Sequence, residues 1–238
     1  MTTTDQRLTA DDWDTWHASG WPTVVTGKEA ETFHRAVQPR PGMNAVDLAC
    51  GSGQWTRQLA AWGVRVTGYD FSATALRQAD AAGLRDGLSY ARWDIDADPI
   101  PPALKPGSLD LVTCRHALPF LEYARVLTDV GRWLRPSGVF YALVRVADDQ
   151  DNDKTDISTK AKPRNDSSLK PFHRGLSEAR ITGLGIGWAR CTTYRLSPRN
   201  CAIVLRSYGD TAFASPDAGG ENLLTATAAA LCSPEVPR

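Results

Sequence analysis

The sequence predicts an α/β fold: a Rossmann-like, doubly wound and mostly parallel sheet with helices on both faces and an antiparallel hairpin strand near the C-terminus. Short apolar runs alternate with stretches of helical periodicity along most of the chain, a pattern typical of parallel strands covered by helices. The 238 residues fit one α/β domain and leave no room for a second large one.

The expected fold begins with a strand, a glycine turn and a helix. Residues 43–49 form a short apolar run that ends at a turn containing Gly51 and Gly53. A helix over 54–62 is expected next, because aromatic and apolar residues recur there at spacings of four and three. A second apolar run over 64–70 then ends on an acid, so the sequence predicts a strand–turn–helix–strand unit.

The same alternation continues to residue 207. The later elements expected are helices over 73–82, 121–134 and 176–184 and strands over 88–93, 109–114, 139–146, 189–196 and 201–207. The proline-rich segment 96–108 is expected to be a loop, because proline cannot donate to a strand ladder. Residues 136–138, Pro-Ser-Gly, are expected to form a turn before strand 139–146, and the sheet is expected to end at the hairpin around 197–200.

Three regions follow from these patterns. Residues 1–30 are expected to form an N-terminal cap helix region, and residues 31–208 the Rossmann-like domain. Within that domain, 147–170 is expected to be a polar lid insertion, because it has too few apolar residues to build a core. Residues 209–238 are expected to form a low-complexity tail.

Composition excludes some function classes. Twenty-seven Lys and Arg balance twenty-seven Asp and Glu, so no net field exists to hold a polyanion, and nucleic acid is not an expected partner. No stretch has the apolar length of a membrane span or the pattern of a signal peptide, so no membrane partner and a cytoplasmic location are expected. The five cysteines form no C-x-x-C pair and are expected to be reduced thiols.

Two carboxylates frame the glycine turn. Asp47 precedes Gly51 by four residues, and Asp70 ends the following strand, seventeen residues after Gly53. A carboxylate at that strand end can accept both hydrogens of a ribose diol, which predicts an adenosine-containing cofactor. A pyrophosphate fingerprint would have a third glycine at Thr56, and Asp47 adds negative charge where a pyrophosphate would lie. The turn therefore favours S-adenosylmethionine, which carries an ammonium and a sulfonium.

The stretches AVDLACGSGQ, VTGYDFS and YARWDID together resemble the class I S-adenosylmethionine-dependent methyltransferases, over roughly residues 30–207. SLDLVTCRHAL resembles the fourth-strand motif of that family. The resemblance implies S-adenosylmethionine as cofactor and implies cofactor contacts from Asp47, Ala49, Cys50, Gly51, Gly53, Asp70, Phe71, Asp94, Ile95 and Arg115. The chain departs from the family at Ala49, where glycine is usual, and Asp96 and Asp98 are near alternatives to Asp94.

Methyl transfer from a sulfonium is an in-line displacement, so alignment can supply most of the acceleration and a dedicated base is optional. If the acceptor is a hydroxyl, a nearby base would add to the rate. The candidates are His116 after the fourth strand, His173 after the polar segment, and His17 near three tryptophans; His34 is set aside as a surface or packing residue. No compact ligand cluster indicates a metal.

The acceptor is expected to be a small molecule. Trp13, Trp16 and Trp21, with Trp55 and Trp62, offer flat faces for an aromatic acceptor. The N-x-P-P-Y-type motif of amino-directed nucleic-acid and protein-glutamine methylases is absent after the fourth strand. The sequence thus predicts methylation of an oxygen or nitrogen of a metabolite, in secondary metabolism, with carbon not excluded. Alternatives are a binding protein for the same cofactor without methyl transfer and, less well supported, an NAD-type oxidoreductase. The oligomeric state stays open.

Overall fold

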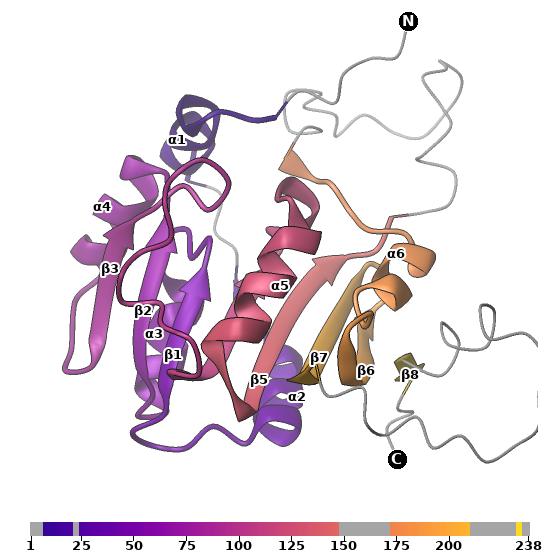
Figure 1. The fold of residues 1–238 in the computed structure, drawn as a ribbon. Helices are drawn as coiled ribbons and strands as arrows, with labels where there is room; N and C mark the ends of the chain where they lie inside the picture. Colours follow the sequence, from indigo (N-terminus) through magenta and orange to yellow (C-terminus); the bar gives the residue numbers. More distant parts are fainter. Residues whose placement is uncertain (1–6, 21–23, 148–171, 210–231, 235–238) are drawn as a thin grey trace, which may run out of the picture.

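The computed structural model describes residues 7–20, 24–147, 172–209 and 232–234. Its centre is a sheet of eight strands in the order β3-β2-β1-β4-β5-β7-β6-β8 (Figure 1). The strands are β1 (Asn44–Leu48), β2 (Arg65–Asp70), β3 (Leu88–Arg92), β4 (Leu109–Arg115), β5 (Leu134–Arg145), β6 (Trp188–Ser197), β7 (Asn200–Tyr208) and β8 (Cys232–Pro234). The first five strands are parallel, and β7 runs antiparallel between β5 and β6.

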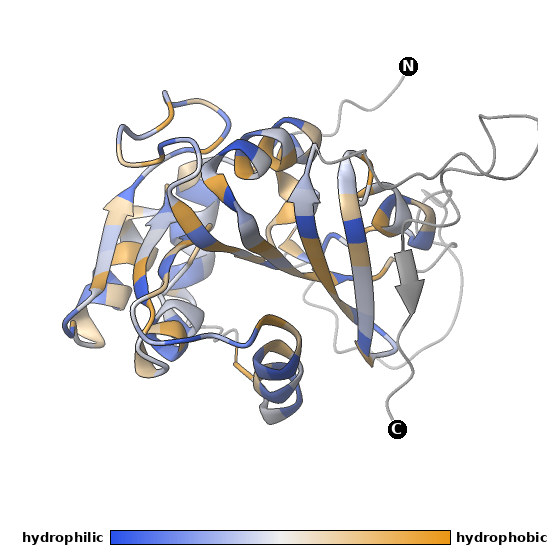
Figure 2. Ribbon diagram, turned by 60° about the horizontal axis from the view of Figure 1, so that its bottom comes forward, coloured by the Kyte–Doolittle hydropathy of each residue, from blue (hydrophilic) through white to orange (hydrophobic). Residues whose placement is uncertain are grey.

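Helices cover both faces of this sheet, as the sequence predicts. They are α1 (Ala10–Ala18), α2 (Gly27–Val37), α3 (Gln54–Ala61), α4 (Ala73–Ala81), α5 (Tyr123–Trp133) and α6 (Glu178–Gly183), with the short 3-10 turn η1 (Leu118–Phe120). One core cluster joins the sheet to α5 and α6, and the other joins it to α2 and α3. The central strands carry the most hydrophobic stretches (Figure 2). Burial on both faces explains why those strands are apolar runs without polar alternation.

Local signals explain where the helices begin. Thr26, Ser72 and Ser177 lie at the N-caps of α2, α4 and α6, and each hydroxyl accepts a hydrogen bond from a backbone N–H in the first turn. Thr9 and Asp12 form a reciprocal capping box at the start of α1. The short polar residue before each apolar stretch therefore sets the helix boundary.

The predicted elements match the observed ones to within a few residues, with two differences. Strand β5 begins at Leu134, so residues 136–138 belong to an irregular early part of the strand, where its register against β4 shifts. The sheet does not end at the β6–β7 hairpin, because β8 pairs in parallel with β6 beyond it. The expected boundary at residue 30 falls inside α2, whereas the insertion expected over 147–170 lies almost wholly outside the described residues.

The prediction of five reduced thiols is wrong at Cys191, which is disulfide-bonded in the structure, whereas Cys50, Cys114 and Cys201 are free. Cysteine spacing in the sequence could not show this, because a disulfide depends on which strands become neighbours. Within the described residues, no helix is both long enough and apolar enough to cross a membrane.

Candidate functional site

A cavity of about 450 Å³ opens at the carboxyl ends of the parallel strands. Ligands of open α/β sheets bind at this edge, in the crevice where the strand order reverses, here between β1 and β4. Each of the first five strands contributes residues to the lining where it ends. These are 49–52 after β1, 70–71 after β2, 93–95 after β3, 115–117 after β4 and Arg145 of β5. Helix α1 and residues 172–174 also contribute to the wall.

The glycine turn is held by Asp70. One carboxylate oxygen of Asp70 accepts the Gly51 N–H and the other accepts the Ser72 N–H, each at 2.8 Å. Gly51 has a positive φ of 54°, and Ala49 has a φ of 51°. Alanine is uncommon in this left-handed region, and Ala49 stands at the position where glycine is usual in the family that the sequence resembles. Asp70 therefore fixes the turn and also lines the cavity.

Gly53, expected to contact the cofactor, is not part of the cavity wall. It is the N-cap of α3, with a φ of 73°, and it packs against Tyr90 of β3. Its place in the structure is at the start of the helix, where its backbone conformation allows α3 to begin directly beneath the turn. Sequence reasoning could not separate the two glycines, because both have the same backbone requirement.

Substituting Gly53 with alanine is expected to destabilise the protein by well over 1 kcal/mol, because the left-handed backbone alone costs about 1–2 kcal/mol. The added Cβ would also lie 2.3 Å from the Tyr90 hydroxyl. Gly42→Ala is the matched control, because Gly42 also has a positive φ but no atom within 4 Å of the added carbon. Urea denaturation of both variants measures the difference. Equal losses would show that the contact with Tyr90 contributes nothing.

Asp47 is almost fully buried, at 1% exposure, and it accepts hydrogen bonds from the hydroxyls of Thr56 and Thr113, each at 2.7 Å. Burial raises the pKa of Asp47 to about 6, and the two hydroxyl groups oppose that shift. Thr56 stands where a pyrophosphate-binding turn would have glycine, and its hydroxyl has a defined partner here. The departure from that fingerprint is therefore part of a buried network under the glycine turn.

Asp70 is 5% exposed, and burial raises its pKa to about 6 as well. The backbone N–H groups of Ser72 and Gly51 oppose this shift by stabilising the ionised form. Cys50, another predicted cofactor contact, lines the cavity, and burial together with the two nearby carboxylates raises its thiol pKa further. The Cys50 thiol therefore stays protonated and is no nucleophile.

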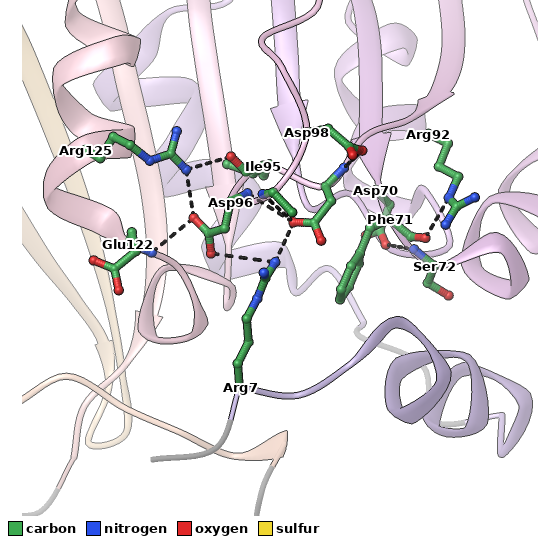
Figure 3. Close-up of polar contacts among 12 residues, drawn as sticks. Arg7, Asp70, Phe71, Ser72, Arg92, Ile95, Asp96, Asp98, Glu122 and Arg125 are labelled. Carbon is green, nitrogen blue, oxygen red and sulfur yellow. Dashed lines mark hydrogen bonds and ion pairs between the residues drawn. The ribbon is translucent and has the colours of Figure 1, made fainter. Parts of the chain in front are cut away.

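Asp94 is the one acid of the 94–98 loop that lines the cavity, together with Ile95. Asp98 accepts the Asp94 N–H, and Asp96 accepts hydrogen bonds from Arg125 and from the Glu122 N–H. The two alternative acids therefore stabilise the loop and its contact with α5. Asp94 also forms a 2.5 Å ion pair with Arg7. Figure 3 shows Arg7 reaching this loop from the N-terminal segment. Asp94, the acid predicted to approach the adenine, is therefore already ion-paired with Arg7 of the segment before α1.

Helix α1 is anchored over the cavity by its side chains rather than by apolar burial. Asp14 accepts hydrogen bonds from the Ser72 hydroxyl at 2.5 Å and from the Thr74 N–H at 2.9 Å, at the N-terminus of α4. Gln78 of α4 donates to the His17 carbonyl. This anchoring places His17 directly over the glycine turn: a Cβ added at Gly51 would lie 3.2 Å from its ring.

Arg115 lines the cavity, but its guanidinium is committed elsewhere. Its Nε and Nη2 donate to the two carboxylate oxygens of Glu29 on α2, at 2.5 and 2.9 Å. Both side chains are buried, at 7% and 2% exposure, and the guanidinium also lies 5.3 Å from the centre of the Trp55 ring. Glu29 was not singled out by the sequence, because its partner is 86 residues away.

All three candidate histidines line the cavity. His116 directly follows β4 with a φ of 58°, a strained backbone of the kind often found at functional sites. Burial, and then the charges of Arg115 and Arg145, lower the pKa of His116 to about 4. Burial lowers the pKa of His17 to about 4, and burial also lowers that of His173, which is exposed. His116 and His17 are therefore neutral at pH 7.

The aromatic residues divide between the cavity and the core. Trp13 and Trp16 of α1 line the cavity, and Trp13 makes edge-to-face contacts with Phe120 and Phe172 at 5.1 Å. Trp55 also lines it, whereas Trp62 stacks on Phe33 in the core, so the expectation that Trp62 faces an acceptor is wrong. Trp21 lies outside the described residues.

Several cavity residues were not predicted as site residues: Arg7, Phe120, Arg145, Phe172 and Asn200. Arg145 could have been found, because it falls at the carboxyl end of an expected strand, the position that exposes side chains to this edge. Asn200 reaches the cavity because β7 runs antiparallel beside β5, where it pairs with Arg145. Nothing in the local sequence indicates that arrangement.

The residues present fit S-adenosylmethionine. The glycine turn exposes backbone beside the buried Asp70 carboxylate, as a ribose diol requires. The acids of the wall lie at the ends of β1, β2 and β3. Their negative charge favours a ligand that carries an ammonium and a sulfonium. Apolar Phe71 and Ile95 flank the predicted adenine end. In the described part of the chain, no group of three His, Cys, Asp or Glu side chains is placed to hold a metal ion.

Residues 46–142 match the methyltransferase domain family. Among curated relatives, the ubiquinone biosynthesis O-methyltransferase of Paraburkholderia xenovorans (strain LB400) is 32% identical over 103 residues, which cover 42% of this chain and 44% of that protein. That of Methylococcus capsulatus (strain ATCC 33009 / NCIMB 11132 / Bath) is 33% identical over 110 residues, 46% of each chain. The matches thus span less than half the length of these relatives.

Solved structures share the fold. A SAM-dependent methyltransferase from Aquifex aeolicus superposes with a TM-score of 0.52 at 15% identity, over 74% of this chain and 88% of that one. Phosphoethanolamine N-methyltransferase 2 of Haemonchus contortus gives a TM-score of 0.57 at 13% identity, over 76% and 53%. The sheet order and the glycine turn agree with the family match, and together they support a class I S-adenosylmethionine-dependent methyltransferase domain over residues 46–142. Its cofactor is S-adenosylmethionine.

Proposed function

We propose that this protein transfers the methyl group of S-adenosylmethionine to an oxygen or nitrogen of a small-molecule acceptor. The observation that carries the proposal is the cavity, which runs without a break from Asp70 and the glycine turn to the aromatic group around Trp13. One volume of about 450 Å³ can therefore hold a nucleoside at one end and an acceptor at the other.

The bound cofactor supplies an electrophilic methyl group on a sulfonium. The chain's part is to align an acceptor with it, and such alignment can contribute about 7–11 kcal/mol of the barrier reduction. Trp13, Trp16, Phe120 and Phe172 offer flat, apolar surfaces that favour an aromatic acceptor. The hydrogen bonds of Asp14 to Ser72 and Thr74 hold helix α1 against α4 at the edge of the cavity. An acceptor from secondary metabolism and a cytoplasmic location stay predictions of the sequence.

His116 is the residue that we propose as general base when the acceptor is a hydroxyl. It is neutral at pH 7, it follows a central strand, and its strained backbone is fixed by a 2.6 Å hydrogen bond from its own N–H to the Leu143 carbonyl. His17 lies over the glycine turn, on the cofactor side, and His173 is more exposed. A base contributes about 10²- to 10⁴-fold to the rate.

His116→Asn is expected to lower kcat by about 10²- to 10⁴-fold and to leave S-adenosylhomocysteine affinity unchanged. Asparagine tolerates a positive φ, so the backbone should be preserved. The measurement is mass spectrometry of candidate metabolites after incubation with S-adenosylmethionine, which detects a methylated product, followed by steady-state kinetics on the best acceptor. His17→Asn and His173→Asn are the controls. A loss of kcat below tenfold for His116→Asn would show that solvent or another group, and not His116, accepts the proton of the acceptor hydroxyl.

Cofactor binding without any methylated product in such a screen would instead favour the alternative of a binding protein. Binding of NAD with no binding of S-adenosylhomocysteine would favour the oxidoreductase. Calorimetry with the two ligands separates these outcomes before an acceptor is known.

A further inference from the structure

Charge is unevenly distributed over the cavity wall. Its carboxylates, Asp47, Asp70 and Asp94, lie at the ends of β1, β2 and β3. At the opposite end, β5 and the segment after it contribute Arg145, His173 and Arg174, beside His116 of β4. Because the carboxylates lie at the other end, the positive charge of Arg145 faces the part of the cavity that the proposed function gives to the acceptor.

Arg145 differs from the other arginines of this wall. Arg7 is paired with Asp94, and Arg115 is paired with Glu29. Arg174 lies over the Phe120 ring at 5.5 Å. Among residues 7–20, 24–147, 172–209 and 232–234, no carboxylate lies within ion-pair distance of Arg145. Arg145 is half-buried, so its guanidinium stays partly hydrated, and its charge remains available to an anionic ligand in the cavity.

The surroundings of Arg145 suit an anion. The charge of Arg145 helps to lower the pKa values of His116 and His173, so the guanidinium acts on both rings. Asn200 pairs with Arg145 across β5 and β7, and it also lines the cavity. An arginine, a neighbouring amide and two imidazoles offer several N–H donors around one space, the kind of donor set that binds a carboxylate or a phosphate.

From this arrangement we infer that the acceptor carries an acidic group, a carboxylate or a phosphate, which pairs with Arg145 while its flat part lies against Trp13, Phe120 and Phe172. This inference rests on the proposed function and adds the class of acceptor. It makes Arg145 a specificity-determining residue: the guanidinium holds the acidic group and so orients the rest of the molecule toward the methyl group.

The test uses the full-length protein saturated with S-adenosylhomocysteine and three small probes: benzoate, phenyl phosphate and benzamide. Quenching of tryptophan fluorescence reports their binding, because Trp13 and Trp16 line the site. At least one of the two anions is expected to bind roughly tenfold or more tightly than the neutral amide, the scale of a charge-assisted hydrogen bond. Whichever anion binds better distinguishes a carboxylate acceptor from a phosphate acceptor.

Arg145→Met is expected to abolish this preference and Arg145→Lys to retain part of it, while S-adenosylhomocysteine affinity stays unchanged in both. Arg85→Met removes the same charge from an exposed position away from the cavity and should behave as the wild type. Equal binding of all three probes by the wild type, or a preference that survives in Arg145→Met, would overturn the inference. Failure of S-adenosylhomocysteine to bind the wild type would overturn the proposed function instead.

Discussion

Asp70→Ala is expected to weaken binding of S-adenosylmethionine by about 2–3 kcal/mol, the scale of losing charge-assisted hydrogen bonds. The substitution removes a carboxylate from the cavity wall and also leaves the N–H groups of Gly51 and Ser72 without their acceptors. Both losses weaken cofactor binding: the first removes a hydrogen-bond acceptor for the ribose, and the second loosens the glycine turn that lies against the cofactor. Isothermal titration calorimetry measures the change. Unchanged affinity in a folded variant would remove Asp70 from the site.

The cofactor affinity of Asp70→Asn, measured as a function of pH, distinguishes the contribution of the Asp70 charge from that of its hydrogen bonds to the glycine turn. Burial raises the pKa of Asp70 to about 6, so the side chain is ionised at pH 7 and becomes protonated as the pH falls through 6. A proton then competes with the ribose hydroxyls for the carboxylate. Wild-type affinity is therefore expected to be constant above pH 7 and to fall below pH 6, whereas Asp70→Asn should be weak throughout, with a smaller slope.

Two further variants serve as controls for this pH dependence. Asp47 has a pKa raised to a similar value, so Asp47→Asn tests whether its titration contributes. Asp80→Asn changes an exposed acid of α4 outside the cavity and should leave the profile unchanged. A pH profile that persists in Asp70→Asn and disappears in Asp47→Asn would assign the titration to Asp47.

Glu29→Gln is expected to destabilise the fold by about 3–5 kcal/mol, because it leaves the Arg115 charge buried without a partner. The pair joins α2 to the end of β4, and both side chains are at most 7% exposed. For a chain of this size, that loss corresponds to a fall in Tm of about 6–20 °C. Differential scanning calorimetry with urea denaturation measures it.

The double variant Glu29→Gln with Arg115→Met should recover much of this loss, since it removes both charges. Arg135→Met breaks an ion pair to Asp110 whose two side chains are 42% and 18% exposed, and should cost less than about 1 kcal/mol. If Glu29→Gln cost no more than Arg135→Met, the buried pair would be a minor contributor to stability.

The course of the chain from β1 to β4 could be predicted from the sequence because its signals are local. Apolar runs, glycines and N-cap residues each act within a few positions of themselves, and the acids Asp47 and Asp70 lie at or next to the carboxyl ends of consecutive parallel strands. Once those strands are parallel, their carboxyl ends must meet at one edge. The grouping of the glycine turn, Asp70 and Asp94 around one cavity therefore follows from topology.

Long-range neighbours had to come from the structure. The Arg115 side chain of the predicted site points to Glu29, and Arg7 reaches Asp94 across 87 positions of the chain. The insertion of β7 between β5 and β6 brings Asn200 beside Arg145. Gly51 and Gly53 have the same sequence signature, yet only Gly51 lines the cavity.

The sequence by itself determined the class of fold and the position of a nucleoside-binding edge, because backbone preferences and hydrophobic periodicity act over short distances and a parallel sheet aligns its strand ends. The tertiary structure alone decided which charges neutralise one another and which remain for a ligand. That choice depends on distances between side chains far apart in the sequence, and Coulomb interactions change steeply over a few ångströms in a buried site. Arg115 and Arg145 end neighbouring strands, and only the fold shows that one of them has Glu29 as a partner.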